Sequence, residues 1–161
     1  MARKRVYIET SVISYLTARP SSDIVKLAKQ KQTWDWWERR SQWELLISPI
    51  VMGEIRRGDP DAATKRVRAV EDLRILPRTE AVDRLADQLI AVGLIPKSEY
   101  SDALHIAIAA GYGIEYLATW NQAHIFNPRC LEKLYSTIRD AGYTPSLLVR
   151  PDYLLEDKDE A

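Results

Sequence analysis

The chain has 161 residues, of which 46% are hydrophobic, and this size and composition fit a single domain with a sizeable core. Its 23 Lys and Arg residues balance its 23 Asp and Glu residues, which argues against a protein that coats nucleic acid through bulk charge. The lone cysteine, Cys130, excludes an internal disulfide framework, and no apolar stretch approaches the roughly 20 residues that span a bilayer, so we expect a cytoplasmic protein with no membrane segment.

Short apolar runs alternate with segments of helical periodicity along the chain. In chain order, the predicted elements are a strand at 5–8, a helix ending before Pro20, a helix at 23–41, a strand at 44–47, a helix from 49 to near 58, a helix at 61–72, a strand at 74–76, helices at 79–92 and 99–110, a strand at 114–120, a helix at 128–141, and a strand at 147–149. Such alternation predicts a mostly parallel sheet with helices on both faces. We therefore expect one α/β domain over 1–161, in which 152–161 form only a short turn and an acidic tail.

Capping residues indicate where helices leave the first two strands. Thr10 or Ser11 caps the first helix. Ser48 caps the helix that follows the second strand, with Pro49 in the favoured first helical position. This places Glu54 about one and a half turns into that helix.

Four oxygen-bearing side chains lie where predicted strands end or helices begin: Glu9, Glu54, Asp102 and Asn121. In an open parallel sheet the functional crevice lies at the carboxyl ends of the strands. Carboxylate and amide oxygens, without any thiol, suit Mg²⁺ or Mn²⁺. A metal held there can acidify a bound water and offset charge on a leaving oxygen, so the pattern favours phosphodiester hydrolysis.

Each of the three acids has another interpretation when it is taken alone. Glu9 could reach solvent or cap a helix, and Asp102 could cap its own helix. Glu54 could pair with Arg57 across one helical turn. Three acids at such positions of one sheet nevertheless favour a shared site.

The charge is unevenly distributed along the chain. Residues 1–80 carry 16 basic and 11 acidic residues, whereas residues 81–161 carry 7 and 12. Basic residues gather soon after Glu54, where they could hold a phosphate backbone: Arg56, Arg57, Lys65, Arg66 and Arg68. A solvated helix face explains them equally well.

Histidines and tryptophans offer further RNA contacts, each with a structural alternative. His105 shares a helix face with Asp102, but a buried, hydrogen-bonded histidine is the favoured interpretation. His124 follows Asn121 and could border the same opening, or belong to an ordinary loop. The tryptophans at 34, 36, 37 and 43 could stack on bases, although their spacing favours a core or oligomer contact.

In their order and spacing, several segments together resemble the PIN-domain nucleases, and within them the VapC-like toxins of toxin–antitoxin pairs. The segments that carry the resemblance are 6–11, 48–54, 101–107, 117–121 and 151–155. The resemblance implies a three-layer α/β/α PIN-like fold with a parallel sheet of about five strands. It also implies Mg²⁺- or Mn²⁺-dependent endoribonuclease activity on single-stranded RNA, a homodimer, and a cognate antitoxin that covers the active site.

The four acidic positions of the family's active site fall on Glu9, Glu54, Asp102 and Asn121, which the resemblance makes both metal ligands and catalytic residues. Aspartates are usual at the first and fourth of these positions. Glu9 keeps the charge but is one methylene longer, and Asn121 loses a unit charge, which weakens binding of a divalent ion.

Two hydroxyls, those of Thr10 and Thr119, resemble groups that flank this site in the family and orient ligands or water. The two departures from aspartate leave open a second interpretation, a catalytically silent PIN-like module that binds RNA or a protein. A phosphohydrolase acting on a small phosphate ester is a third interpretation, and the absence of a Gly-rich phosphate loop argues against it.

Overall fold

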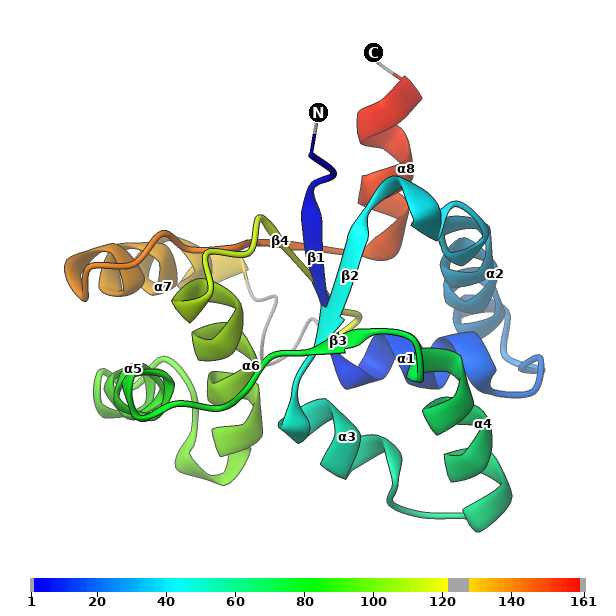
Figure 1. Ribbon diagram of the computed structural model, residues 1–161, viewed down its shortest axis with the longest axis horizontal. Coiled ribbons are helices and arrows are strands. Elements are labelled where there is room, and N and C mark those ends of the chain that lie inside the picture. The colour runs from blue at the N-terminus through cyan, green and yellow to red at the C-terminus, as the bar shows by residue number, and fades with distance from the viewer. Residues whose placement is uncertain (1, 122–127, 160–161) are drawn as a thin grey trace.

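The computed structural model describes residues 2–121 and 128–159, and its centre is a five-stranded, all-parallel sheet (Figure 1). The strands are β1 (Arg5–Ile8), β2 (Glu44–Ile47), β3 (Arg74–Ile75), β4 (Tyr116–Ala118) and β5 (Leu147–Val149). They lie in the order β3-β2-β1-β4-β5, and every neighbouring pair is parallel. The predicted α/β/α architecture with about five strands is confirmed.

Helices cover both faces of this sheet. The α-helices are α1 (Thr10–Thr17), α2 (Ile24–Glu38), α3 (Pro49–Ile55), α4 (Pro60–Val70), α5 (Glu80–Ala91), α6 (Tyr100–Gly111), α7 (Pro128–Asp140) and α8 (Pro151–Asp159), with short 3₁₀ helices η1 (Arg40–Gln42) and η2 (Lys97–Glu99). Helices α5, α6 and α7 form one layer, and α1, α2, α4 and α8 form the other (Figure 1). No helix in the described part of the chain is long and apolar enough to cross a bilayer.

The central strand, β1, brings the ends of its neighbours together. Val6, Tyr7 and Ile8 are fully buried, as expected for a strand covered on both faces. Ile8 pairs with Ala118 of β4, and the backbone N–H of Glu9 donates to the carbonyl of Ala118 at 3.1 Å. The residues that follow β1, β2 and β4 therefore meet at one edge of the sheet.

The first helix is capped differently from the sequence prediction. Glu9, rather than Thr10 or Ser11, is the N-cap of α1: its backbone is extended, and its carboxylate accepts the N–H of Ser11 at 2.9 Å. Thr10 already has a helical backbone as the first residue of α1. The predicted cap of α3 is confirmed, because the Ser48 hydroxyl accepts the N–H of Val51 at 3.3 Å.

Several element boundaries also differ from the prediction. Helix α3 ends at Ile55 instead of near residue 58, and β4 covers only 116–118 because the N–H of Ile114 still bonds to the carbonyl of Ala109 at the end of α6. Helix α6 begins directly after η2 without a side-chain cap. The segment after β5, predicted as a short turn before a tail, is the helix α8, which packs on α2.

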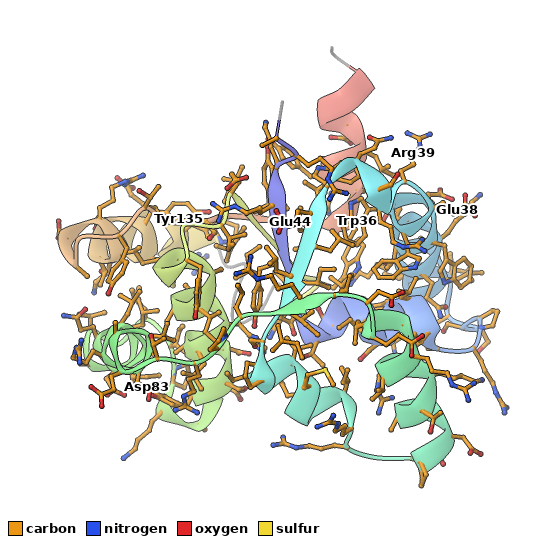
Figure 2. All side chains as sticks on the ribbon, viewed as in Figure 1. Trp36, Glu38, Arg39, Glu44, Asp83 and Tyr135 are labelled. Carbon is orange, nitrogen blue, oxygen red and sulfur yellow. The ribbon has the colours of Figure 1, made fainter. Side chains whose placement is uncertain are left out.

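Helix α2 buries a face that its apolar pattern does not predict. The residues it buries are Gln30, Thr33 and Trp36, while Ile24 is 85% exposed. Trp36 lies between α2 and the sheet (Figure 2), with its ring 6.2 Å from that of Trp43. These two tryptophans are core residues, which confirms that interpretation over base stacking.

Gln30 is buried because it completes the hydrogen bonds of the connection between α1 and α2. Its amide nitrogen donates to the carbonyls of Ala18 at 3.3 Å and Arg19 at 3.0 Å, and its oxygen accepts the N–H of Ser21 at 2.8 Å. A buried backbone group without a partner is costly. The polar side chain therefore fixes this connection through three backbone groups.

We expect Gln30→Leu to lower the free energy of unfolding by about 1–3 kcal/mol, because a side chain of similar volume removes the hydrogen-bond partner of three partly buried backbone groups. Urea denaturation measures the loss. Gln32→Leu, at an exposed position of the same helix, is the matched control and should change stability little. Equal stability of the two variants would contradict this role of Gln30.

Candidate active site

Polar side chains gather at the carboxyl ends of β1, β2 and β4. The first residues beyond these strands are Glu9, Ser48 and Thr119, and all three are buried. Helix α6 adds Asp102 and His105, which are also buried. This edge therefore carries a buried polar group inside an otherwise apolar core.

The Glu9 carboxylate is fixed by neutral hydrogen-bond donors. One oxygen accepts the N–H of Ser11 at 2.9 Å, and the other accepts the Thr119 hydroxyl at 2.7 Å and the Ser11 hydroxyl. The side chain is only 5% exposed and makes no ion pair within the described residues. The carboxylate is thus buried among neutral hydrogen-bond donors.

Asp102 and Asn121 lie next to each other beside this group. Asp102 is 6% exposed in the first turn of α6, and the Asn121 amide nitrogen lies 3.4 Å and 3.5 Å from its two carboxylate oxygens. The Thr119 hydroxyl also accepts the N–H of Asn121 at 3.0 Å, so Thr119 connects Glu9 to Asn121. The structure thus brings three of the four predicted site residues into adjoining positions.

Glu54 is held from the other side of the same edge. Its Oε1 accepts the Thr10 hydroxyl at 3.0 Å and contacts His105 Nε2 at 2.5 Å. His105 Nδ1 lies 2.7 Å from the Tyr7 hydroxyl, which lies 2.7 Å from the Ser48 hydroxyl. A continuous buried chain of hydrogen bonds therefore runs from Ser48 to Glu54.

The protonation of this chain follows from its burial and contacts. Burial raises the pKa of Tyr7, so its hydroxyl keeps its proton within this chain of hydrogen bonds. Partial burial acts to raise the pKa of Glu54, but hydrogen bonds from His105 and Thr10 and the nearby charge of Arg57 lower it overall. Glu54 is therefore ionised near neutral pH, and Nε2 of His105 donates to it.

The candidate RNA contacts have different outcomes. Arg56 and Arg57 are exposed just beyond α3, and Glu54 makes no ion pair with Arg57. The favoured interpretation of His105 as a buried, hydrogen-bonded residue is confirmed over an RNA contact, because its side chain has no exposed surface and both ring nitrogens are hydrogen bonded. His124 lies outside the described residues.

Two members of the polar group were not singled out as site residues from the sequence. The position of Tyr7 within an apolar run predicts an ordinary buried strand residue, and the position of Ser11 predicts a helix cap. Tyr7 contacts His105 of the distant helix α6, and the Ser11 hydroxyl, besides donating to Glu9 two positions away, accepts the N–H of Trp120 from beyond β4. No local pattern signals such contacts.

The donor types at this edge suit a hard divalent cation, because they are carboxylate, amide and hydroxyl oxygens. Glu9, a buried carboxylate with neutral partners only, also leaves negative charge for a cation to balance. Among residues 2–121 and 128–159, no three His, Cys, Asp or Glu side chains group closely enough to hold a metal ion. The four-residue ligand set stays a prediction.

Comparison with known proteins identifies the fold. No protein-family model and no curated protein matches the chain. Among solved structures, VapC20 of Mycobacterium tuberculosis, a sarcin–ricin loop cleaving toxin, matches with a TM-score of 0.52 and 19% identity over 74% of this chain and 92% of that one. VapBC2 of Rickettsia felis, bound to a DNA fragment from its promoter, matches with a TM-score of 0.56 and 13% identity over 91% and 98%. The chain therefore has the VapC-like PIN fold.

We expect Glu54→Gln to lower stability at neutral pH by about 1–2 kcal/mol, because the ionised carboxylate is the stronger hydrogen-bond acceptor for His105 and Thr10. The pKa of Glu54 is lower in the folded chain than its ordinary value of 4.5. The stabilisation is therefore fully present above the unfolded pKa and is lost as the pH falls through the folded pKa.

Urea denaturation of both proteins across the acid range measures this effect. The wild type and Glu54→Gln should differ at pH 7 and converge at low pH. Glu38→Gln, at an exposed position of α2 (Figure 2), is the control that should follow the wild type throughout. A difference that does not change with pH would count against an ionised Glu54 in this hydrogen-bond chain.

Proposed function

We propose that this protein is a metal-dependent endoribonuclease that cleaves RNA phosphodiester bonds as the toxin of a toxin–antitoxin pair. The observation that carries the proposal is the pair of buried carboxylates, Glu9 and Asp102, at the carboxyl edge of a VapC-like fold. The likeness to VapC20, a sarcin–ricin loop cleaving toxin, supports RNA as the substrate class.

The residues that would hold a divalent ion are Glu9, Glu54, Asp102 and Asn121. When bound, Mg²⁺ or Mn²⁺ supplies a Lewis acid for the phosphate and lowers the pKa of water. The chain's own contribution is to hold these oxygens in place: Thr119 and Ser11 fix Glu9, and Thr10 fixes Glu54.

Glu54 is better suited to binding an ion or orienting water than to abstracting a proton. Its lowered pKa makes it a weak general base. One of its oxygens, Oε1, is already occupied by Thr10 and His105, whereas Oε2 makes no hydrogen bond within the described residues. We assign Oε2 as the atom that contacts the ion or a water at the reacting phosphate.

The proposal extends to partners and location. The likeness to VapBC2 supports a cognate antitoxin, and the family resemblance supports a homodimer in the cytoplasm. The first turn of α2 exposes an apolar surface that could contact another protein chain, because Ile24 and Val25 are 85% and 63% exposed.

A catalytically silent PIN-like module is the second candidate, and one contact favours it. The nitrogen of the Asn121 amide, rather than its oxygen, faces Asp102. In that orientation the amide satisfies the carboxylate without a cation. Turning the amide would present its oxygen instead, so the two candidates differ in whether a divalent ion binds here.

We expect Asp102→Asn to reduce RNA cleavage by at least about 100-fold, because a removed charged ligand takes away several kcal/mol of transition-state stabilisation. Gel analysis of an RNA panel with Mg²⁺ or Mn²⁺ measures the loss. Asp140→Asn, at an exposed position of α7, is the control that should cleave normally. Cleavage by Asp102→Asn at the wild-type rate would refute the assignment, and a wild type that neither cleaves RNA nor binds Mn²⁺ would support the silent module.

We expect Asn121→Asp to bind Mn²⁺ at least about tenfold more tightly than the wild type, because the change adds a charged ligand. In EDTA the same variant should melt at a lower temperature, since a second carboxylate would then face Asp102. Calorimetric titration and thermal melting measure the two effects. Unchanged Mn²⁺ affinity would place Asn121 outside the ion site.

A further inference from the structure

A groove of about 340 Å³ lies between α3 and the start of α6, directly beside Glu54. Its lining includes Gly53, Glu54 and Arg57 on α3, Tyr100 on α6, and Arg78, which precedes α5. One end of the groove is therefore at the candidate active site. The remaining residues of the lining are mostly apolar.

Two arginines from separate elements supply the positive charge of this groove. Arg57 is exposed, and its guanidinium makes no hydrogen bond or ion pair within the described residues. Arg78 is 43% exposed, and its Nε donates to Asp83 of α5 (Figure 2) at 2.6 Å. That contact, together with an interaction with the Tyr100 side chain, restrains the guanidinium in one orientation at the edge of the groove.

Gly53 lines the groove without a side chain, although glycine lowers the stability of helix α3. A glycine inside a helix is less stable than an alanine, and Gly53 does not have the positive φ that would require glycine. A Cβ at this position would meet no atom within 4 Å, so packing does not require glycine either. A side chain added here would therefore extend into the open space of the groove beside Glu54.

Tyr100 provides a fixed aromatic surface in the same groove. Its hydroxyl donates to Asp87 at 3.0 Å, which restrains the ring. Aromatic rings in such positions stack on bases or sugars of single-stranded nucleic acids with little dependence on sequence. Guanidinium groups bind phosphate oxygens through paired, charge-assisted hydrogen bonds.

We propose that this groove binds the single-stranded RNA beside the scissile bond, with Arg57 and Arg78 holding a neighbouring phosphate and Tyr100 lying against its nucleoside. The inference rests on the proposed ribonuclease function and defines where its substrate strand runs. Because the whole chain has no net charge, RNA binding must depend on such local groups.

Fluorescence anisotropy with a short labelled single-stranded RNA in EDTA tests the proposal without cleavage. We expect Arg57→Gln and Arg78→Gln each to raise Kd by about 5–20-fold. Each should also lower the slope of log Kd against log salt by about 0.7, the contribution of one phosphate contact on a single strand. Arg139→Gln, on the exposed surface of α7, removes the same charge outside the groove and should leave both quantities unchanged.

Substitutions at Gly53 test the groove by volume instead of charge. Gly53→Gln should raise Kd more than Gly53→Ala does, because the longer side chain occupies the space beside Glu54. Neither variant should melt below the wild type, since both replace a glycine inside a helix. A loss of affinity with retained stability identifies blocked binding and excludes misfolding.

The outcomes separate this inference from the proposed function. If the wild type cleaves RNA but the arginine and Gly53 variants bind it normally, the groove inference is overturned and the nuclease stands. If binding depends on both arginines but no RNA is cleaved with Mg²⁺ or Mn²⁺, the groove inference stands and the nuclease does not. A wild type with no affinity for the labelled RNA overturns the groove inference.

Discussion

The buried carboxylate of Glu9 is the constraint on which the site depends. It caps α1 through the N–H of Ser11 and, through Thr119, ties the end of β1 to the end of β4. A carboxylate removed from water needs these donors, so the same contacts that start a helix also fix the spacing between two strands. Thr119 also accepts the N–H of Asn121, and the Asn121 amide in turn lies beside the Asp102 carboxylate.

The two halves of the site are built by different means. Glu9 is held by donors within a few residues of two strand ends, whereas Glu54 is held by His105, which reaches it from the buried face of α6. The low pKa of Glu54 is a consequence of that contact. Glu54 is therefore ionised at neutral pH, and an ionised carboxylate is the form that binds a divalent cation.

Local patterns in the sequence predicted the strands and most helices, because apolar runs and caps such as Ser48 act on their immediate neighbours. They could not predict the buried face of α2, where Gln30 is inside because loop carbonyls need it. They gave the cap role of Glu9 only as an alternative to a site role and favoured Thr10 or Ser11 as the cap, whereas Glu9 caps α1 and also accepts the Thr119 hydroxyl from beyond β4. The positions of the acids were predictable, whereas their hydrogen-bond partners required the tertiary structure.

Both ends of the chain lie at the edge of the sheet opposite the polar group (Figure 1). Residues 5 and 44 start their strands at that edge, and α8 runs along α2 toward the same side. An affinity tag, a fluorescent label or a surface tether attached to either terminus would thus leave the groove beside Glu54 accessible. Immobilised protein is accordingly suited to measuring RNA capture from solution.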